Sequence, residues 1–562
     1  MKLNIKLLIL LGIFVIAFIL RFYKLGDVPN GLYQDETSIG YNAYSIMTTG
    51  KDEYGKIFPL YFKSFGDYKL PIYIYSAIIP IKLFGLNAFA VRFPSAFFGF
   101  LTVVMFYFFI KEITDKKNLA LVATFLLTIN PWHLHYSRAT FEVSISLFLF
   151  IVGTYLLSRA FKKGKSIEFF VGTCLFILCI YTYNLTRLLS PILYFSVILI
   201  YKNELKKISK GTFIISTIFS IFLLTPFIIS FISGGGISSA LGTLIFSSAA
   251  VKAPLLELRS YFINIPPIIS KLFFSINAMI LLQYLQNIAS YFSINFFFIA
   301  GSLHGNHGIG NVGQFYLFEL PLFIYGLILS LKHNSWGKIF VLWGIITILV
   351  AGATREVPHA TRSFFLVVPI IVCIALGVLA VWKKIISIKI SSLRIGILAI
   401  CLAFAFYNII YYFASYYIRF PIAYAKAWRT TDKELSLFLA QNEIRYDKII
   451  FDKDAGFIYS SMLFYSKYPP LDFQKTSMRE ADTSEGFSNI KSFGKYEFRT
   501  INWDKDIKIP NALIITDFLK KPKDLSALTI FYYPLRPIVL AVEQKIISYP
   551  FREPSYVVYE TH

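Results

Sequence analysis

Several charged side chains stand close together near the start of the chain, in the segment of residues 21–71. They are the side chains of Asp35, Glu36, Asp52, Glu53, Asp67 and Lys69. The segment follows an apolar run at residues 7–20, which is typical of a membrane segment or a signal sequence. Carboxylates held at a membrane surface can accept a proton, and a lysine among them can neutralise an anion. We therefore interpret residues 21–71 as an active-site loop lying on a membrane.

The composition indicates a polytopic membrane protein. Of the 562 residues, 56% are hydrophobic and only 15% are charged, and the mean hydropathy is +0.61. A soluble core could not bury that much apolar surface. The net charge is +23, but Lys and Arg fall mostly in short loops between apolar runs, which is typical of cytoplasmic helix ends and argues against nucleic-acid binding. The four cysteines lie inside apolar runs, so we expect neither disulfides nor a zinc site.

The apolar runs and basic loops predict about eleven membrane crossings, with the amino terminus in the cytoplasm. The run at residues 72–84 is short, and counting it as a crossing would place three basic loops outside. We therefore assign it to an extended first outer loop, residues 21–91. Because successive loops alternate between the two faces of the membrane, this count of crossings places every candidate site segment on the outer face. The later crossings are predicted at about residues 92–110, 119–129, 141–158, 167–182, 187–201, 211–231, 315–331, 339–353, 363–382 and 395–413.

The chain changes character after the last predicted crossing. Residues 1–413 are interpreted as a transmembrane catalytic domain, and residues 414–562 are polar enough to form a soluble domain outside the membrane. Strand-like residues 446–452 and 512–517 and a helix-like stretch at residues 431–441 predict an α/β or α+β fold. The segment carries no nucleophile motif and no glycine-rich phosphate loop. We expect it to shield the site or to help bind an acceptor.

Asp35 and Glu36 stand at the start of a stretch with one apolar helical face. The structural interpretation is an N-cap and a favourable first-turn charge. A helix start also holds a carboxylate at a fixed height above the membrane, as a general base requires. Lys69 and Arg92 stand at the edges of apolar runs, where a cation either snorkels to interfacial water or meets a lipid phosphate. For these residues both interpretations stay open.

Further imidazoles, guanidiniums and a carboxylate fall in the later outer segments. They belong to His133, His135, Arg138, Glu142, His304, His307, His359 and Arg362. Gathered with the first loop, they would form a pocket with carboxylates for a nucleophile's proton and cations for a leaving phosphate. The pairs of closely spaced histidines could also ligate a divalent ion, but such spacing alone is weak evidence. We expect no metal and no other cofactor to be required.

Four segments resemble a known family in order and spacing. They are QDE at residues 34–36, DYKLP at residues 67–71, FGLNAFAVRFPSAFFG at residues 84–99 and HYSRATFE at residues 135–142. Together they resemble the amino-terminal half of the GT-C membrane glycosyltransferases, most of all the branch of the protein O-mannosyltransferases and the lipid A aminoarabinose transferase. Residues 313–327 and 358–369 look like later segments of bacterial members.

The resemblance implies an inverting enzyme of the plasma membrane. Such an enzyme transfers a single sugar from a polyprenyl-phosphate donor to a protein, lipid or envelope-glycan acceptor on the outer face. It implies that Asp35 is catalytic with Glu36 as its neighbour, and that Lys69 contacts the carrier phosphate. Further cations expected at the donor phosphate are those of Arg92, Arg138, His359 and Arg362.

Some site candidates match the family less well. Relatives often have a second proline where this chain has Leu70, and often an aspartate where it has Glu142. His135, His304 and His307 are further site candidates, and His304 is assigned only by its place in the long outer loop.

Two other functions stay open. An oligosaccharyl transferase or a glycan ligase would use a lipid pyrophosphate donor that carries a longer glycan. A transporter or flippase for lipid-linked glycans belongs to another class of protein. The sequence shows no internal repeat, and its charges cluster in outer loops, whereas transporters usually have repeats and intramembrane charges.

Overall fold

The computed structural model groups the chain into two compact units. Unit 1 consists of Met1–Tyr23, Ser95–Ser137 and Phe141–Phe413, and unit 2 consists of Lys24–Pro94, Arg138–Thr140 and Ala414–His562. Unit 1 ends at Phe413, and the first outer loop belongs to the same unit as the C-terminal segment. The predicted division into a catalytic domain and a soluble domain stays a prediction.

The structure describes most of the chain. The described residues are 5–64, 68–233, 243–246, 248–261, 265–302, 304–332, 336–453, 458–481, 489–522, 525–533, 540–542, 545–547 and 553–561. Asp67 of the predicted active-site loop lies outside them.

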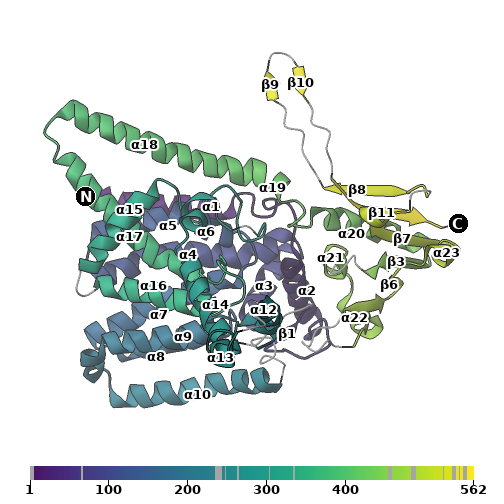
Figure 1. Cartoon of the computed structure of the whole chain (residues 1–562), viewed down its shortest axis with the longest axis horizontal. Helices are drawn as coiled ribbons and strands as arrows, with labels where there is room; N and C mark the ends of the chain where they lie inside the picture. The colour runs from purple at the N-terminus through teal and green to yellow at the C-terminus, as the bar shows by residue number, and fades with distance from the viewer. Residues whose placement is uncertain are drawn as a thin grey trace. The chain divides into compact units, whose positions relative to one another are not determined.

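Unit 1 is built from apolar helices (Figure 1). Its α-helices are α1 (Ile5–Phe22), the larger part of α4 (Ala88–Thr114), α5 (Lys117–Ile129), α6 (Pro131–Tyr136), α7 (Glu142–Lys163), α8 (Ser166–Ile180), α9 (Thr186–Ile200), α10 (Lys210–Ser233), α12 (Ser248–Tyr261), α13 (Pro267–Phe273), α14 (Ile276–Ser290), α15 (Glu319–Lys332), α16 (Trp336–Gly352), α17 (Val367–Ile386) and α18 (Ser391–Ala414). Short 3₁₀ or π turns stand at Lys202–Lys207, Asn295–Ile299 and Phe364–Leu366.

Several of these helices are suited to cross a membrane. Among the described residues, six helices are long and apolar enough, and the count rises to seven if the bent pair α15 and α16 forms one span. Four more apolar helices are shorter, with 10–17 residues each. The predicted positions from residue 141 onward each coincide with a helix, α7 to α10 and α15 to α18. The predicted number of about eleven crossings is not confirmed, because the shorter helices fall below the length that a bilayer requires.

Close helix packing in unit 1 depends on small residues. Helices α15 and α17 pack against each other along their length. A methyl group on Gly326 of α15 would overlap the carbonyl oxygen of Cys373, and one on Gly377 of α17 would overlap that of Leu322. The missing side chains therefore let the two backbones touch, as is typical of helix pairs in membranes.

Unit 2 begins with the first outer loop, which contains two helices and a small hairpin. Helix α2 (Gln34–Thr49) ends at Gly50, whose φ of 71° is the left-handed conformation that glycine adopts at helix ends. Strands β1 (Phe62–Lys63) and β2 (Tyr68–Lys69) pair antiparallel, and the short apolar helix α3 (Pro71–Phe84) follows. Helix α3 covers the run that the sequence analysis assigned to the loop.

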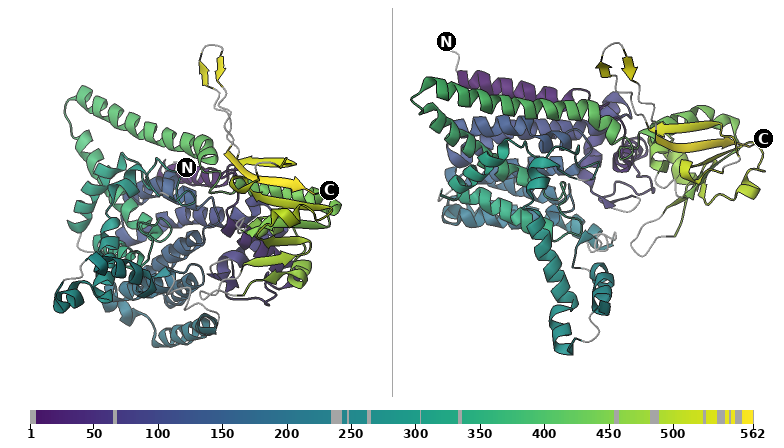
Figure 2. Two further views of the ribbon diagram at one scale, coloured as in Figure 1. Left: turned by 45° about the vertical axis from the view of Figure 1, so that its right-hand side comes forward. Right: turned by 45° about the horizontal axis from the view of Figure 1, so that its top comes forward.

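The C-terminal segment forms a mixed sheet of seven described strands, in the order β4-β5-β6-β3-β7-β11-β8 (Figures 1 and 2). Strand β3 pairs parallel with β6 and β7, and the outer pairs are antiparallel. The strands are β3 (Lys448–Asp452), β4 (Met478–Arg479), β5 (Ile490–Phe493), β6 (Tyr496–Arg499), β7 (Ala512–Asp517), β8 (Thr529–Tyr533) and β11 (Glu553–Glu560), with β9 (Leu540–Val542) and β10 (Lys545–Ile547) in a separate hairpin. The predicted strands are β3 and β7.

Four helices pack against the sheet in unit 2. They are α20 (Thr430–Asn442), α21 (Ile458–Tyr465), α22 (Pro470–Thr476) and α23 (Trp503–Asp506). A further short helix, α19 (Phe420–Ala423), precedes them, and short turns stand at Ser415–Arg419, Glu443–Arg445 and Phe518–Lys520. Alternate residues of β3 and β7 pack against α20, α21 and α22 in one core cluster. Tyr41 of α2 belongs to the same cluster, so the first outer loop and the C-terminal segment share a hydrophobic core. The predicted helix at residues 431–441 is α20.

Candidate active site

The first turn of α2 carries the two carboxylates that the sequence singled out. Asp35 Oδ1 lies 2.8 Å from Lys69 Nζ, and the exposed fractions of the two side chains are 35% and 8%. Lys69 stands on β2 opposite Phe62 of β1, so the hairpin fixes the lysine against the helix start. The amino end of α2 is itself a favourable place for a carboxylate. The structure thus joins the predicted base and the predicted phosphate ligand in one ion pair.

Glu36 is fully buried, and four donors surround its carboxylate. Arg92 donates from Nε and Nη2, each at 2.9 Å. Thr140 donates from its backbone N–H at 3.0 Å and from its hydroxyl at 2.9 Å. Neither Glu36 nor Arg92 has any exposed side-chain surface. A buried ion pair persists only when its remaining atoms are hydrogen-bonded, as they are here.

Two arginines hold the chain that leads into α2. Arg92 donates from Nη1 to the carbonyl oxygens of Leu25 at 3.2 Å and Pro29 at 2.8 Å, and from Nη2 to Gly31. Arg138 is 1% exposed. It donates to the carbonyl oxygens of Lys24 at 3.3 Å and Val28 at 3.2 Å, and its guanidinium lies over the rings of Tyr416 and Tyr417. Together with Asp35, Glu36, Lys69 and Thr140, these two arginines form what we call the carboxylate cluster.

The other carboxylates of the first loop have structural partners. Glu53 is 3% exposed, and its Oε2 lies 3.4 Å from Nη2 of Arg479, whose guanidinium stacks on Tyr54. Burial raises the pKa of Glu53, and the arginine opposes that rise. Asp52 accepts hydrogen bonds at Oδ1 from the backbone N–H groups of Tyr54 and Lys56. These residues brace the loop against the C-terminal segment within unit 2.

Unit 1 contains a second gathering of candidate residues, which we call the histidine cluster. It consists of Tyr136, His304, His307, Glu356, His359, Thr361 and Arg362. The ring centroid of His307 lies 4.6 Å from that of His359 and 5.9 Å from that of His304. Thr361 is the centre of its hydrogen bonds: the hydroxyl lies 2.8 Å from the Tyr136 hydroxyl and 3.1 Å from His307 Nδ1, and the backbone N–H donates to His359 Nδ1 at 3.2 Å.

Two imidazoles of this cluster, those of His307 and His359, favour the neutral form. Burial, with the nearby charges of His304, His135 and Arg362, lowers the pKa of His307 to about 3. Burial and the neighbouring His307 also lower the pKa of His359. At neutral pH these rings therefore act as hydrogen-bonding groups without charge.

The remaining predicted residues of unit 1 have varied surroundings. Arg362 donates to Glu356, with Nη2 3.2 Å from Oε2 of a carboxylate that is 61% exposed. His135 is buried, and its Nε2 lies 2.8 Å from the carbonyl oxygen of Asn306. Glu142 is half-buried in the first turn of α7. The structure therefore brings most of the predicted residues together in two groups, one in each unit, and His135 and Glu142 belong to neither group.

The described side chains lack the arrangement that a metal ion needs. In the part of the chain that the structure describes, no group of three or more His, Cys, Asp or Glu side chains could hold a metal ion. The expectation that no metal is needed stays a prediction, since only an activity measurement tests it.

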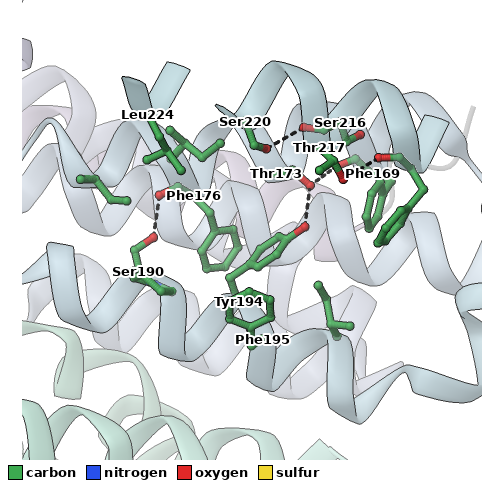
Figure 3. A pocket seen from close by; sticks show the side chains of 15 residues that line it. Phe169, Thr173, Phe176, Ser190, Tyr194, Phe195, Ser216, Thr217, Ser220 and Leu224 are labelled. Atoms are coloured by element: carbon green, nitrogen blue, oxygen red, sulfur yellow. Dashed lines mark hydrogen bonds between the residues drawn. The ribbon is translucent and has the colours of Figure 1, made fainter. Parts of the chain in front are cut away.

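One cavity of unit 1 is lined by none of the residues of these clusters. It has a volume of about 440 Å³ and lies between α8, α9 and α10 (Figure 3). Most of its hydroxyl groups bond to helix backbone or to each other, as Ser190 does to the carbonyl oxygen of Phe176 and Tyr194 does to Thr173. No acidic or basic side chain lines it. A cavity of this kind offers no group for acid-base chemistry.

Two contributors to the carboxylate cluster and its surroundings could not be predicted from the sequence. Thr140 stands inside the recognised motif at residues 135–142, but nothing in its type marks it as a ligand of Glu36. Arg429 donates from Nη1 to Oε1 of Gln34 at 3.1 Å. It comes from the C-terminal segment, and no periodicity or motif signals a contact over so long a sequence separation.

Comparisons with known proteins bear on the family and the fold of the chain. Residues 12–231 match the model of the family described as dolichyl-phosphate-mannose-protein mannosyltransferase. Among solved structures, ArnT from Cupriavidus metallidurans bound to undecaprenyl phosphate matches with a TM-score of 0.53 and 10% identity, over 98% of this chain and 97% of that chain. The chain has the GT-C fold.

A second matched structure is a larger enzyme. The Archaeoglobus fulgidus oligosaccharyltransferase tethered with an acceptor peptide matches with a TM-score of 0.50 and 13% identity, over 83% of this chain. This chain spans only 63% of that protein's length. No curated protein sequence matches the chain. The matched family consists of mannosyltransferases and the second matched structure is an oligosaccharyltransferase, and the long apolar helices of unit 1 agree with a multi-pass membrane enzyme.

Proposed function

We propose that this protein transfers a single sugar from a polyprenyl-phosphate donor to an acceptor on the outer face of the plasma membrane, with inversion. The observation that carries the proposal is the ion pair of Asp35 with Lys69 at the start of α2. Both residues lie within the 12–231 segment that matches the mannosyltransferase family. The matched ArnT structure contains undecaprenyl phosphate, a lipid of the donor class proposed here.

The two members of the pair have complementary roles in the proposed reaction. The ammonium of Lys69 binds the donor phosphate, and this exchange of partners frees the Asp35 carboxylate. Asp35 then accepts the proton of the acceptor's nucleophilic group while the new glycosidic bond forms at the anomeric carbon and the bond to the phosphate breaks. Lys69 stabilises the charge that develops on the leaving phosphate. The partly exposed carboxylate is open to an acceptor, whereas the lysine is nearly buried.

Glu36, Arg92 and Arg138 have positioning roles in this proposal. The Glu36 carboxylate accepts hydrogen bonds from four donors. The guanidinium of Arg92 donates to that carboxylate and to three carbonyl oxygens. Arg138 is similarly committed to the carbonyl oxygens of residues 24 and 28. Releasing such buried cations to a phosphate would leave these acceptors unpaired. We therefore assign phosphate binding to Lys69 and the framework of the site to these three residues.

The residues of unit 1 stay secondary candidates. Arg362 is paired with an exposed carboxylate, and an exposed ion pair contributes only about 0–1 kcal/mol, so its guanidinium can change partners at low cost. It is the better of the two proposed phosphate contacts in unit 1, since His359 favours the neutral form. The proposed reaction uses no metal, and activity that survives a chelator would support that part.

The deciding experiment is the replacement Asp35→Asn, assayed in vesicles with a polyprenyl-phosphate sugar. Loss of general base catalysis should lower kcat by about 10²–10⁴-fold. Asp472→Asn is the matched control, because Asp472 is also a first-turn aspartate of a helix in unit 2, but is exposed. Full turnover of a folded Asp35→Asn variant would refute the assignment.

The donor role of Lys69 is tested separately. Lys69→Ala should raise the KM for the donor and lower its kcat/KM by about tenfold or more, because a charge-assisted contact to the phosphate is lost. Lys56→Ala removes an exposed lysine from the same loop and should leave the donor KM unchanged. An unaltered donor KM in Lys69→Ala would contradict phosphate binding.

An oligosaccharyl transferase is the second candidate, favoured by the match to the archaeal enzyme. The two candidates differ in the donor. Mass spectrometry of cell-envelope lipids with and without the protein should reveal an accumulating polyprenyl monophosphate with one sugar if the first candidate is right. An accumulating pyrophosphate with a longer glycan would favour the second.

A further inference from the structure

The first residue of α2 is held by a side chain from the C-terminal segment. Arg429 donates from Nη1 to Oε1 of Gln34 at 3.1 Å. Gln34 directly precedes Asp35, so this contact acts on the turn of backbone that carries the proposed base. Helix α2 has no side-chain N-cap, since Tyr33 stands at the capping position. The start of the helix therefore depends on groups outside it.

Arg429 is itself anchored on its far side. Its Nε lies 2.8 Å from Oδ2 of Asp432, a carboxylate with only 1% exposure. Asp432 also accepts from the hydroxyls of Tyr556 on β11 at 3.1 Å and Ser461 on α21 at 3.2 Å. The backbone of Arg429 has a φ of 50°, the left-handed conformation that costs energy in a residue other than glycine. The surrounding contacts of unit 2 must hold that conformation.

Neighbouring contacts act on the same few residues before and after Asp35. The Trp428 ring meets Tyr33 edge-on with centroids 5.3 Å apart, and Arg92 lies over the same indole. A methyl group on Gly31 would overlap the carbonyl oxygen of Trp428, so only glycine allows this close approach. On the other side of Asp35, the hydroxyl of Thr37 lies 2.9 Å from that of Ser460. The C-terminal segment thus contacts the chain on both sides of the proposed base.

We propose that Arg429 is a positioning residue for Asp35, through its hydrogen bond to Gln34. This inference rests on the proposed function of Asp35. The C-terminal segment then does more than shield the site or help bind an acceptor: it sets the height and orientation of the carboxylate at the start of α2. Displacing a catalytic group by about 1 Å can cost on the order of 10²-fold in rate, so one charge-assisted hydrogen bond at this point affects turnover.

A double-mutant cycle with Gln34→Met and Arg429→Met tests the inference. Each single variant should lower kcat by about tenfold and leave the donor KM within about twofold, because Lys69 keeps its place. The double variant should be no slower than either single variant, since both remove the same contact. Gln34→Met leaves the Arg429 pair with Asp432 intact, so its result is readable even if Arg429→Met fails to fold.

A matched control is available at the opposite end of α2. Gln474 of α22 donates from Nε2 to Ser45 Oγ at 3.2 Å and to the carbonyl oxygen of Asp52 at 2.9 Å. Gln474→Met removes a similar contact between the C-terminal segment and α2, far along the helix from Asp35. It should leave kcat within about twofold of the parent.

Three results would overturn the inference: unchanged kcat in Gln34→Met, an additive loss in the double variant, or an equal loss in Gln474→Met. The inference and the proposed function fail in different ways. An active Asp35→Asn variant refutes the function. An inactive Asp35→Asn variant together with a fully active Gln34→Met variant refutes only the positioning role.

Discussion

The carboxylate cluster of unit 2 and the histidine cluster of unit 1 differ in the charge of their buried groups. In the carboxylate cluster each charged side chain has an oppositely charged partner or several hydrogen bonds, and Glu36 has both, from Arg92 and Thr140. In the histidine cluster, burial and neighbouring charges suppress protonation, and His307 is left neutral with a pKa of about 3. Its ion pair between Arg362 and Glu356 joins a mostly buried guanidinium to a carboxylate that is 61% exposed.

This difference bears on which cluster can support sugar transfer. Breaking a bond to phosphate needs a proton acceptor and a cation that are present at neutral pH. Asp35 and Lys69 meet that need, whereas neutral imidazoles offer only hydrogen bonds. The histidine cluster is suited to hold polar groups of a substrate or to stabilise unit 1. The variants below test how far the two clusters really differ.

The largest expected effect comes from comparing Glu36→Gln with Glu356→Gln. The same change removes one partner of an ion pair in each cluster, and the pairs differ in exposure: Glu36 is 0% exposed and Glu356 is 61% exposed. Glu36→Gln should lower the free energy of unfolding by about 3–5 kcal/mol, because it leaves the Arg92 cation buried without its counter-charge. Glu356→Gln should cost about 0–1 kcal/mol. Denaturant unfolding in detergent measures both.

Equal losses in the two variants would remove the distinction between the clusters. A Glu36→Gln variant of normal stability but without activity would also matter. It would give Glu36 a catalytic role beside Asp35, in place of the positioning role proposed above.

The sequence predicted best those helices and strands that are marked by a continuous run of apolar or strand-forming residues. Apolar runs predicted the positions of α7 to α10 and α15 to α18, and strand-like runs predicted β3 and β7. Strands β4 and β5 are short and partly exposed, so no run of apolar residues marks them. The number of crossings is harder to predict, because helices such as α8 and α9 are apolar but short.

The candidate site was only partly predictable for a different reason. Motifs gave Asp35 and Lys69 as residue types in a loop, but their ion pair depends on the β1–β2 hairpin that folds the lysine back onto α2. The buried pair of Glu36 with Arg92 likewise joins two separate motifs. Arg429 lies in a segment without any motif, and only the tertiary fold brings it to Gln34. Long-range pairing of this kind leaves no periodic signal in a sequence.

The next prediction concerns pH and the histidine cluster. An unfolded histidine has a pKa of about 6.5, whereas folding lowers that of His307 to about 3. Between these values the unfolded chain binds a proton that the folded chain does not. Stability from this group is therefore complete above about pH 6.5 and falls as the pH drops, by at most about 1.4 kcal/mol per pH unit. The shift of His359 has the same sign.

His307→Gln should therefore flatten the dependence of the unfolding midpoint on pH between about 6.5 and 4.5. His304→Gln is the control, because His304 is an exposed member of the same cluster. A steeper loss of stability in His307→Gln than in the parent would show that the imidazole is charged in the folded protein, and the contrast with the carboxylate cluster would be gone.

The smallest expected effect comes from replacing one threonine in each cluster by valine, which keeps the shape and removes the hydroxyl. In Thr140→Val the buried carboxylate of Glu36 loses a donor at 2.9 Å but keeps the backbone N–H of the same residue and both bonds from Arg92. In Thr361→Val the neutral groups of Tyr136 and His307 lose their shared partner. Hydrogen bonds to charged groups contribute about 1.5–3 kcal/mol and neutral ones about 0.5–1.5 kcal/mol, so Thr140→Val should destabilise more. Unfolding midpoints of the two variants, measured side by side at pH 7, give the order. A reversed order would mean that the histidine cluster carries charge at that pH, and the contrast with the carboxylate cluster would be lost.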